Sequence, residues 1–237
     1  MCPYTVGVSL RGIICGGTVL DKTHILTAAH CVKHNEDTAW GIEVIINTRN
    51  WYYRENNVFQ VSKAIIHKDY KQGTHNNIHN LADIAVLKLD RELPLEALRT
   101  RLQTVSLPNS VPQVNTTAEI CGFGNTNQGL PEPPRWMYKL QTTTISLAEC
   151  RQYVIDRLHT SHLCTRSSVG QGLSIGDSGS PLIHNGKVIG VASWGHEVNL
   201  ATRQPQVFTD VYTYGSWIRD AMNWNDASRA SEHWIYL

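Results

Sequence analysis

The chain has 237 residues, enough for one substantial domain or for two small β lobes packed together. Its hydrophobic fraction of 41% is ordinary for a globular protein that buries a core. With 21 Lys and Arg against 20 Asp and Glu, the formal net charge is +1. This balance gives no electrostatic basis for binding nucleic acid or an anionic membrane. No apolar run approaches the roughly 20 residues of a membrane helix, and Met1–Leu10 has no signal-peptide pattern.

Short alternating apolar stretches recur along the chain, separated by Gly, Pro, Asn and Asp, and they predict β-strands. The predicted strands are Tyr4–Leu10, Gly41–Ile46, Val58–Ile66, Ile84–Leu89, Thr117–Cys121, Leu140–Ile145 and Lys187–Trp194. Two helices are predicted, Leu147–Tyr153 after the N-cap candidate Ser146, and Val211–Trp224 with one apolar face. Many short strands with regular turn signals indicate an all-β sandwich or barrel.

The segment Asn109–Gln113 contains a turn-prone Pro near the middle of the chain, and we expect it to link two lobes. The six cysteines contain no Cys-x-x-Cys pair, so a zinc ribbon or a thioredoxin-type motif is not indicated. Disulfides in an oxidising compartment and buried free thiols in a cytosolic protein both fit these cysteines, and composition does not separate the two.

Three distant segments carry the chemistry: Leu26-Thr27-Ala28-Ala29-His30-Cys31, Asp83-Ile84-Ala85-Val86-Leu87 and Gly176-Asp177-Ser178-Gly179-Ser180-Pro181. A serine hydroxyl needs an adjacent base to take its proton, and histidine titrates in the right range. The imidazole in turn needs a carboxylate to fix its tautomer and to stabilise the imidazolium. Each segment alone is weak, but the chain order His, Asp, Ser makes a chance combination very improbable.

With these motifs the chain resembles the trypsin-like (chymotrypsin-fold) serine proteases. The resemblance implies an all-β fold of two packed six-stranded antiparallel β-barrels with a C-terminal helix. It makes Ser178 the nucleophile, His30 the general base and Asp83 the residue that orients His30. The family usually has glycine where this chain has Ser180, and we expect that change to be tolerated.

The same resemblance implies that the backbone N–H groups of Gly176 and Ser178 form an oxyanion hole. Ser193-Trp194-Gly195 matches the family's strand beside the substrate. Ser193 is expected near Asp83, and Gly195 is expected to offer backbone hydrogen bonds to an extended peptide.

The family pattern also assigns the cysteines. It implies bridges Cys15–Cys31, which flank the His30 loop, and Cys150–Cys164, after the short helix. The bridge that normally braces the primary pocket is not expected, because Ser174 stands where its first cysteine should be. We hypothesise that the remaining two cysteines, Cys2 and Cys121, form a third bridge.

Substrate preference in this family follows the residue six positions before the nucleophile, which is Gly172 here. A trypsin would carry Asp there, so cleavage after basic residues loses its electrostatic basis. Gly195 leaves the pocket mouth open, and Gln206 stands where a pocket glycine usually lies. We therefore expect cleavage after uncharged residues. The alternative is a pocket obstructed by the Gln206 amide.

Family members begin with an Ile-Val-Gly-Gly-like segment released by cleavage, and its amine pairs with the Asp before the nucleophile, here Asp177. This chain begins at Cys2-Pro3-Tyr4, where the family is already in its first strand, so we expect a truncated N-terminus and a zymogen-like pocket. An unpaired buried Asp177 carboxylate costs several kcal/mol. The alternative is a non-catalytic homologue that acts as a binding or regulatory module. The intact triad favours truncation.

Two other classes fit less well. The α/β-hydrolase elbow needs Gly-x-Ser-x-Gly, whereas Ser180 fills the last position, and that fold runs Ser, Asp, His. A metal protein could use His75 and His79, but the segment Gly73–Asn77 indicates a polar loop, and we expect no metal and no cofactor.

We expect one peptidase domain over 1–237, with a first lobe over about 1–108 and a second over about 114–237 that includes the C-terminal helix and tail. The predicted partners are a protein or peptide substrate and a protein protease inhibitor, with no nucleic acid or membrane partner. We expect a secreted monomer.

Overall fold

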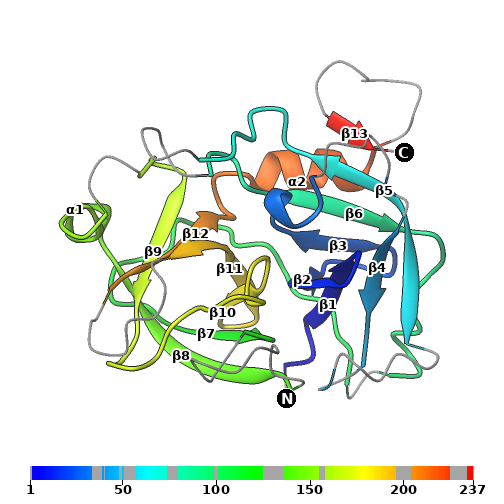
Figure 1. Cartoon of the computed structure of the whole chain (residues 1–237), viewed down its shortest axis with the longest axis horizontal. Coiled ribbons are helices and arrows are strands. Elements are labelled where there is room, and N and C mark those ends of the chain that lie inside the picture. Colours follow the sequence, from blue (N-terminus) through cyan, green and yellow to red (C-terminus); the bar gives the residue numbers. More distant parts are fainter. Residues whose placement is uncertain are drawn as a thin grey trace.

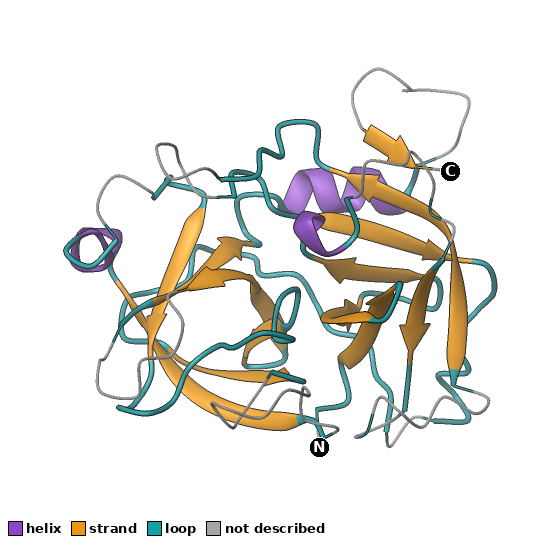
Figure 2. Ribbon diagram, viewed as in Figure 1, coloured by secondary structure: helices purple, strands orange, loops and turns teal. Residues whose placement is uncertain are grey.

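A computed structural model describes residues 2–33, 39, 41–47, 50, 57–73, 80–98, 101–124, 136–154, 158–195 and 204–224, and the backbone of 234–236. Strands dominate it, with few and short helices (Figure 2). They form two antiparallel barrels that lie side by side (Figure 1). This architecture confirms the predicted fold class. In the described part of the chain, no helix is long and apolar enough to cross a membrane.

The first barrel closes through six strands, because β5 pairs with both β4 and β6. Its strands are β1 (Thr5–Leu10), β2 (Ile13–Val19), β3 (His24–Thr27), β4 (Ile42–Ile45), β5 (Val58–Ile66) and β6 (Ala85–Leu89). A seventh strand, β13 (Trp234–Tyr236), pairs antiparallel with the end of β5. The sheet therefore includes a strand from the opposite end of the chain.

The second barrel is closed in the strand order β10-β11-β12-β9-β8-β7. Its strands are β7 (Thr117–Gly122), β8 (Tyr138–Ile145), β9 (His162–Arg166), β10 (Pro181–His184), β11 (Lys187–Gly195) and β12 (Gln206–Asp210). The segment between β6 and β7 touches both barrels, since Val105 N–H donates to Val19 O at 3.1 Å and Val188 N–H donates to Ser106 O at 3.0 Å.

Two predicted helices are present in shorter form. Helix α1 (Leu147–Arg151) begins after Ser146, whose hydroxyl accepts from Glu149 N–H at 3.0 Å, so the expected N-cap is correct. Helix α2 (Gly215–Met222) begins four residues later than predicted. Asp210 explains the delay, because its carboxylate accepts from Tyr212 N–H at 3.2 Å and from the Thr213 hydroxyl at 2.6 Å, which holds a turn there.

Helix α2 follows the second barrel in sequence but packs on the first, beside β6 (Figure 1). Its buried residues Ile218 and Ala221 join the same core as the first-barrel strands. Val188 and Val191 of β11 also belong to this core, so apolar packing continues from one barrel to the other.

Three disulfides link the described residues: Cys2–Cys121, Cys15–Cys31 and Cys150–Cys164. The pairing agrees with the family pattern and with the hypothesis for the third bridge. Cys2 precedes β1 and Cys121 lies in β7, so this bridge joins the two barrels. Together the core and the disulfides fix the relative position of the barrels, and the candidate site lies where they meet.

Candidate active site

His30 is presented by a short 3-10 helix, η1 (Ala29–Cys31), directly after β3. Ala28 and Ala29 are fully buried, and Cys31 is tied by its disulfide to Cys15 of β2. The His30 side chain keeps 23% exposure between these buried neighbours. The small alanines allow the turn to pack closely.

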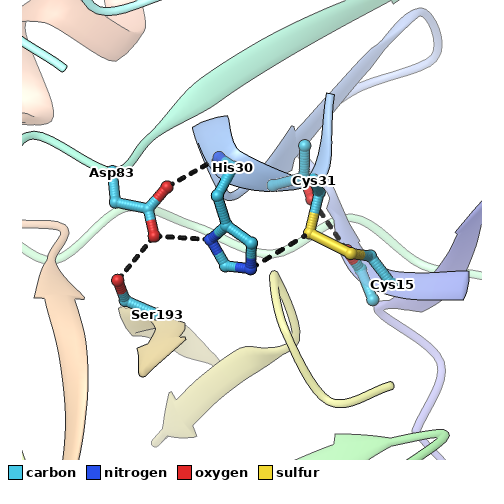
Figure 3. Close-up of a disulfide and its surroundings, with 7 residues drawn as sticks. Cys15, His30, Cys31, Asp83 and Ser193 are labelled. Carbon is cyan, nitrogen blue, oxygen red and sulfur yellow. Dashed lines mark hydrogen bonds and ion pairs between the residues drawn. A yellow bond between two sulfur atoms is a disulfide. The ribbon is translucent and has the colours of Figure 1, made fainter. Parts of the chain in front are cut away.

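Asp83 precedes β6 and its side chain is fully buried. Its Oδ1 accepts from His30 N–H at 2.9 Å, and its Oδ2 lies 2.7 Å from His30 Nδ1 (Figure 3). Since the carboxylate is an acceptor, Nδ1 of the neutral ring carries the proton and Nε2 has a free lone pair. The pair thus presents a base through Nε2.

The second barrel also contacts Asp83. The Ser193 hydroxyl of β11 donates to Asp83 Oδ2 at 2.5 Å (Figure 3). The Thr209 hydroxyl of β12 donates to the Asp83 carbonyl oxygen at 2.8 Å. Residues of both barrels therefore fix this one aspartate.

Opposing effects act on the His30 ring. Burial lowers the pKa of His30, but the Asp83 charge and its hydrogen bond together outweigh burial, so the net pKa is raised.

His30 Nε2 lies 3.8 Å from Cys31 Sγ. Within the described part of the chain, the Ser178 hydroxyl makes no hydrogen bond to this nitrogen.

Ser178 lies in the loop between β9 and β10, and its backbone ties that loop to both barrels. Its carbonyl oxygen accepts from Gly16 N–H of β2 at 2.7 Å, and the next residue, Gly179, donates to Ala192 O of β11 at 2.8 Å. Because Gly16 follows Cys15, and Cys15 is bonded to the neighbour of His30, the Ser178 loop and the His30 turn share one support.

The backbone N–H groups of Gly176 and Ser178 in this loop donate to none of the described residues. Gly176 has φ +102, and a Cβ there would lie 2.8 Å from Phe123 O, so glycine is required. Unpaired N–H groups beside a serine suit an incoming oxyanion.

Asp177 as a residue is partly exposed, but protein surrounds its carboxylate. Oδ1 accepts from Gly124 N–H at 2.7 Å and Oδ2 accepts from Ser174 N–H at 3.0 Å. Burial raises the pKa of Asp177 to about 6, although these two hydrogen bonds act in the opposite direction. Among the described residues, no cationic side chain pairs with it.

The predicted pocket residues lie on adjoining segments of the second barrel. Gly195 of β11 pairs with Gln206 of β12, and a Cβ at Gly195 would lie 3.8 Å from Gln206 Cγ. Gln206 is buried, and its Oε1 lies 3.5 Å from the Ser167 hydroxyl, its donor. Gly172 and Trp194 are half-buried. The same hydroxyl lies closer to Thr142 Oγ1, at 3.0 Å, so its contact with the Gln206 amide is the weaker of the two.

Two residues near Asp83 were not predicted from the sequence. Thr209 supports Asp83 through its hydroxyl. Tyr70 is buried near Asp83, and burial first, with the Asp83 charge second, raises the pKa of its phenol. No local pattern marks Tyr70, because its part in the site depends on packing alone.

The ring of His30 and the sulfurs of Cys15 and Cys31 lie close enough for a metal site among the described residues. The two sulfurs form a disulfide and are not thiolate ligands. His75 and His79 lie outside the described residues.

Comparison with known proteins identifies the family to which this chain is similar. A family model described as Trypsin matches residues 1–218. Trypsin-3 of Homo sapiens is 31% identical over 223 residues, which cover 93% of this chain and 68% of that protein. Chymotrypsin-2 of Vespa crabro is 30% identical over 224 residues, covering 92% of this chain and 93% of that protein.

A solved structure agrees in fold. Neuropsin, a serine protease expressed in the limbic system of mouse brain, has a TM-score of 0.81 and 24% identity over 93% of this chain and 94% of its own. Closed twin barrels with a His–Asp pair at their junction define the class of chymotrypsin-fold proteins. The chain belongs to the trypsin family of serine proteases.

Proposed function

We propose that the protein is a serine endopeptidase that uses Ser178, His30 and Asp83. The observation that carries this proposal is the His30–Asp83 pair, with Nδ1 2.7 Å from the carboxylate and the Nε2 lone pair free to accept a proton. Family membership favours this function over a non-catalytic binding module.

In the proposed reaction, the Ser178 oxygen attacks the carbonyl carbon of a peptide bond while His30 Nε2 takes its proton. Asp83 stabilises the imidazolium and keeps its charge. The N–H groups of Gly176 and Ser178 donate to the oxyanion. Collapse of the tetrahedral intermediate breaks the C–N bond, and His30 gives the proton to the leaving amine. Water then releases the acyl group from Ser178 by the same steps.

For specificity, we propose cleavage after uncharged residues. Gly172 supplies no carboxylate to a basic side chain, and Gln206 offers only a neutral amide near the pocket. Trp194 and Gly195 would hold the substrate's extended backbone. Profiling with a peptide library tests this, and a strong preference for Arg or Lys before the cleaved bond would contradict it.

Asp177 is proposed as the carboxylate that pairs with an α-amino group in the active form. Its support is a surrounded carboxylate that has two backbone donors and, among the described residues, no cationic side chain. An ammonium group there would repay the desolvation of the charge. This pairing would hold the adjacent oxyanion hole in place.

The three disulfides favour an extracellular location, because such bonds persist in oxidising compartments. The proposed partners are protein substrates and a protein inhibitor that occupies the same site. Size-exclusion chromatography with light scattering tests the expected monomer.

The deciding experiment is labelling with a serine-directed fluorophosphonate. Labelling of the wild-type chain should disappear in Ser178→Ala and fall strongly in His30→Ala, because the hydroxyl is then absent or not activated. Ser168→Ala, which changes an exposed serine of the same loop, is the matched control and should label normally. Labelling that persists in Ser178→Ala would refute the assignment.

A further inference from the structure

Ser180, where the family usually has glycine, has an unusual environment. It is fully buried, and its hydroxyl makes no hydrogen bond. A Cβ at Gly16 of β2 would overlap the Ser180 Oγ and lie 2.7 Å from the Ser180 Cα. The hydroxyl therefore fits only because position 16 has no side chain. An unpaired buried hydroxyl is costly, so its retention needs a reason.

The nearest feature with spare hydrogen-bonding capacity is the Asp177 carboxylate. A Cβ at Gly122 of β7 would overlap Asp177 Oδ1 and lie 2.9 Å from Ser180 Oγ. Both oxygens therefore lie against the same face of Gly122. Asp177 uses two acceptor sites, for Gly124 N–H and Ser174 N–H, of the roughly four that a carboxylate has.

Among the described residues, no cationic side chain neutralises this carboxylate. In the described part of the chain, no lysine, arginine or histidine affects the pKa of Asp177. Burial raises this pKa, and the two backbone hydrogen bonds lower it. The elements packed against it present the backbone of Gly122, Gly124 and Ser174. The Ser180 hydroxyl is a donor with no printed partner that lies beside this carboxylate, against Gly122.

We propose that Ser180 is a positioning residue whose hydroxyl donates to the Asp177 carboxylate, directly after rotation about Cα–Cβ or through one trapped water. The hydrogen bond holds the carboxylate against β7, and with it the backbone of Gly176 and Ser178. Its effect on catalysis rests on the proposed function. The hydrogen bond itself does not.

The test measures Asp177 directly, by carboxyl carbon NMR titration of the full chain. Loss of the donor in Ser180→Ala should raise the Asp177 pKa by about half a unit to one unit, since the ionised form loses a hydrogen bond. Ser180→Gly, with the family's residue, should do the same if the alanine variant folds poorly. Thr18→Val removes another fully buried, unpaired hydroxyl from β2 and should leave Asp177 unchanged.

An unchanged or lowered Asp177 pKa in both Ser180 variants would overturn the proposal and leave Ser180 a space-filling residue. Fluorophosphonate labelling of the same samples separates the two hypotheses. A wild-type chain that does not label shows that Ser178 is not activated in this chain, while the titration still decides the role of Ser180. If the chain labels, the acid limb of the labelling rate should move to higher pH in Ser180→Ala but not in Thr18→Val.

Discussion

Ser193 and His30 share one oxygen of a buried carboxylate. Asp83 Oδ2 accepts the Ser193 hydroxyl at 2.5 Å and faces His30 Nδ1 at 2.7 Å. Ser193 comes from the second barrel and His30 from the first, so the carboxylate is the point at which the two barrels jointly set the imidazole. Charge-assisted hydrogen bonds of this kind are among the stronger ones in proteins.

Replacing Ser193 by alanine should weaken both fold and site. The buried Asp83 charge loses one donor, which costs about 2 kcal/mol of unfolding free energy. The less stabilised carboxylate then attracts the imidazolium proton more strongly, so the His30 pKa rises and the acid limb of kcat/KM moves to higher pH. Urea unfolding and a pH–rate profile measure the two effects. Ser62→Ala, which removes an exposed hydroxyl bonded to Lys88 O, is the control and should change neither.

Asp177→Asn should change the pH dependence of stability. The folded pKa of about 6 lies above the ordinary value of 3.8, so folding favours the protonated carboxyl. That stability is complete below the unfolded pKa and is lost as pH rises through the folded pKa. Asparagine stays neutral, so its stability relative to wild type should improve by about 2–3 kcal/mol between pH 4 and pH 8.

Urea unfolding of both chains at the two pH values measures this difference for Asp177→Asn. Asp220→Asn, on the exposed surface of α2, is the matched control for the substitution. A variant that instead loses stability at pH 8 would mean that a cation neutralises Asp177.

The disulfides should differ in their contributions because they close chain segments of different length. Cys2–Cys121 joins residues 119 apart and Cys150–Cys164 joins residues 14 apart. In the chain-entropy account, the longer loop restricts the unfolded state by about 2 kcal/mol more. Paired Cys→Ser variants of each bridge, compared by urea unfolding, measure this. Equal losses would show that unfolded-chain entropy does not set the contribution.

Gly179 and Gly186 offer a matched pair for backbone crowding. They have similar left-handed φ values of +77 and +71. A Cβ at Gly179 would overlap Thr27 Oγ1 and lie 2.5 Å from Gly16 O, whereas a Cβ at Gly186 would have nothing within 4 Å. Gly186→Ala should cost about 1–2 kcal/mol from the backbone alone. Gly179→Ala should cost several kcal/mol and abolish labelling, and similar losses would refute the packing argument.

The sequence predicted strands best where apolar and polar residues alternate. The expected Val58–Ile66 agrees with β5, and Thr117–Cys121 is one residue short of β7. It missed β2, β3, β9, β10, β12 and β13, and two of these show why. β2 contains Gly16 and Gly17, which lower strand propensity but leave room for Ser180 and Ile25, and β10 begins with Pro181.

Within the site, the residue types in three motifs were enough to nominate His30 and Asp83, which lie together. The surroundings of Asp177 could not be foreseen, because the donors Gly124 and Ser174 belong to loops whose approach depends on barrel packing. The Gln206 amide was expected at the pocket, but its partner Ser167 lies on a neighbouring segment with no distinctive sequence signal.

Helix α2 has a consequence for biosynthesis. The core of the first barrel includes Val211, Ile218, Ala221 and Trp224, all from the last part of the chain. While the ribosome is still making the second barrel, the emerging first barrel lacks these side chains and leaves apolar surface uncovered. Native packing of the first barrel therefore requires α2, which is synthesised only after the second barrel, and this favours slow folding with a need for protection during synthesis.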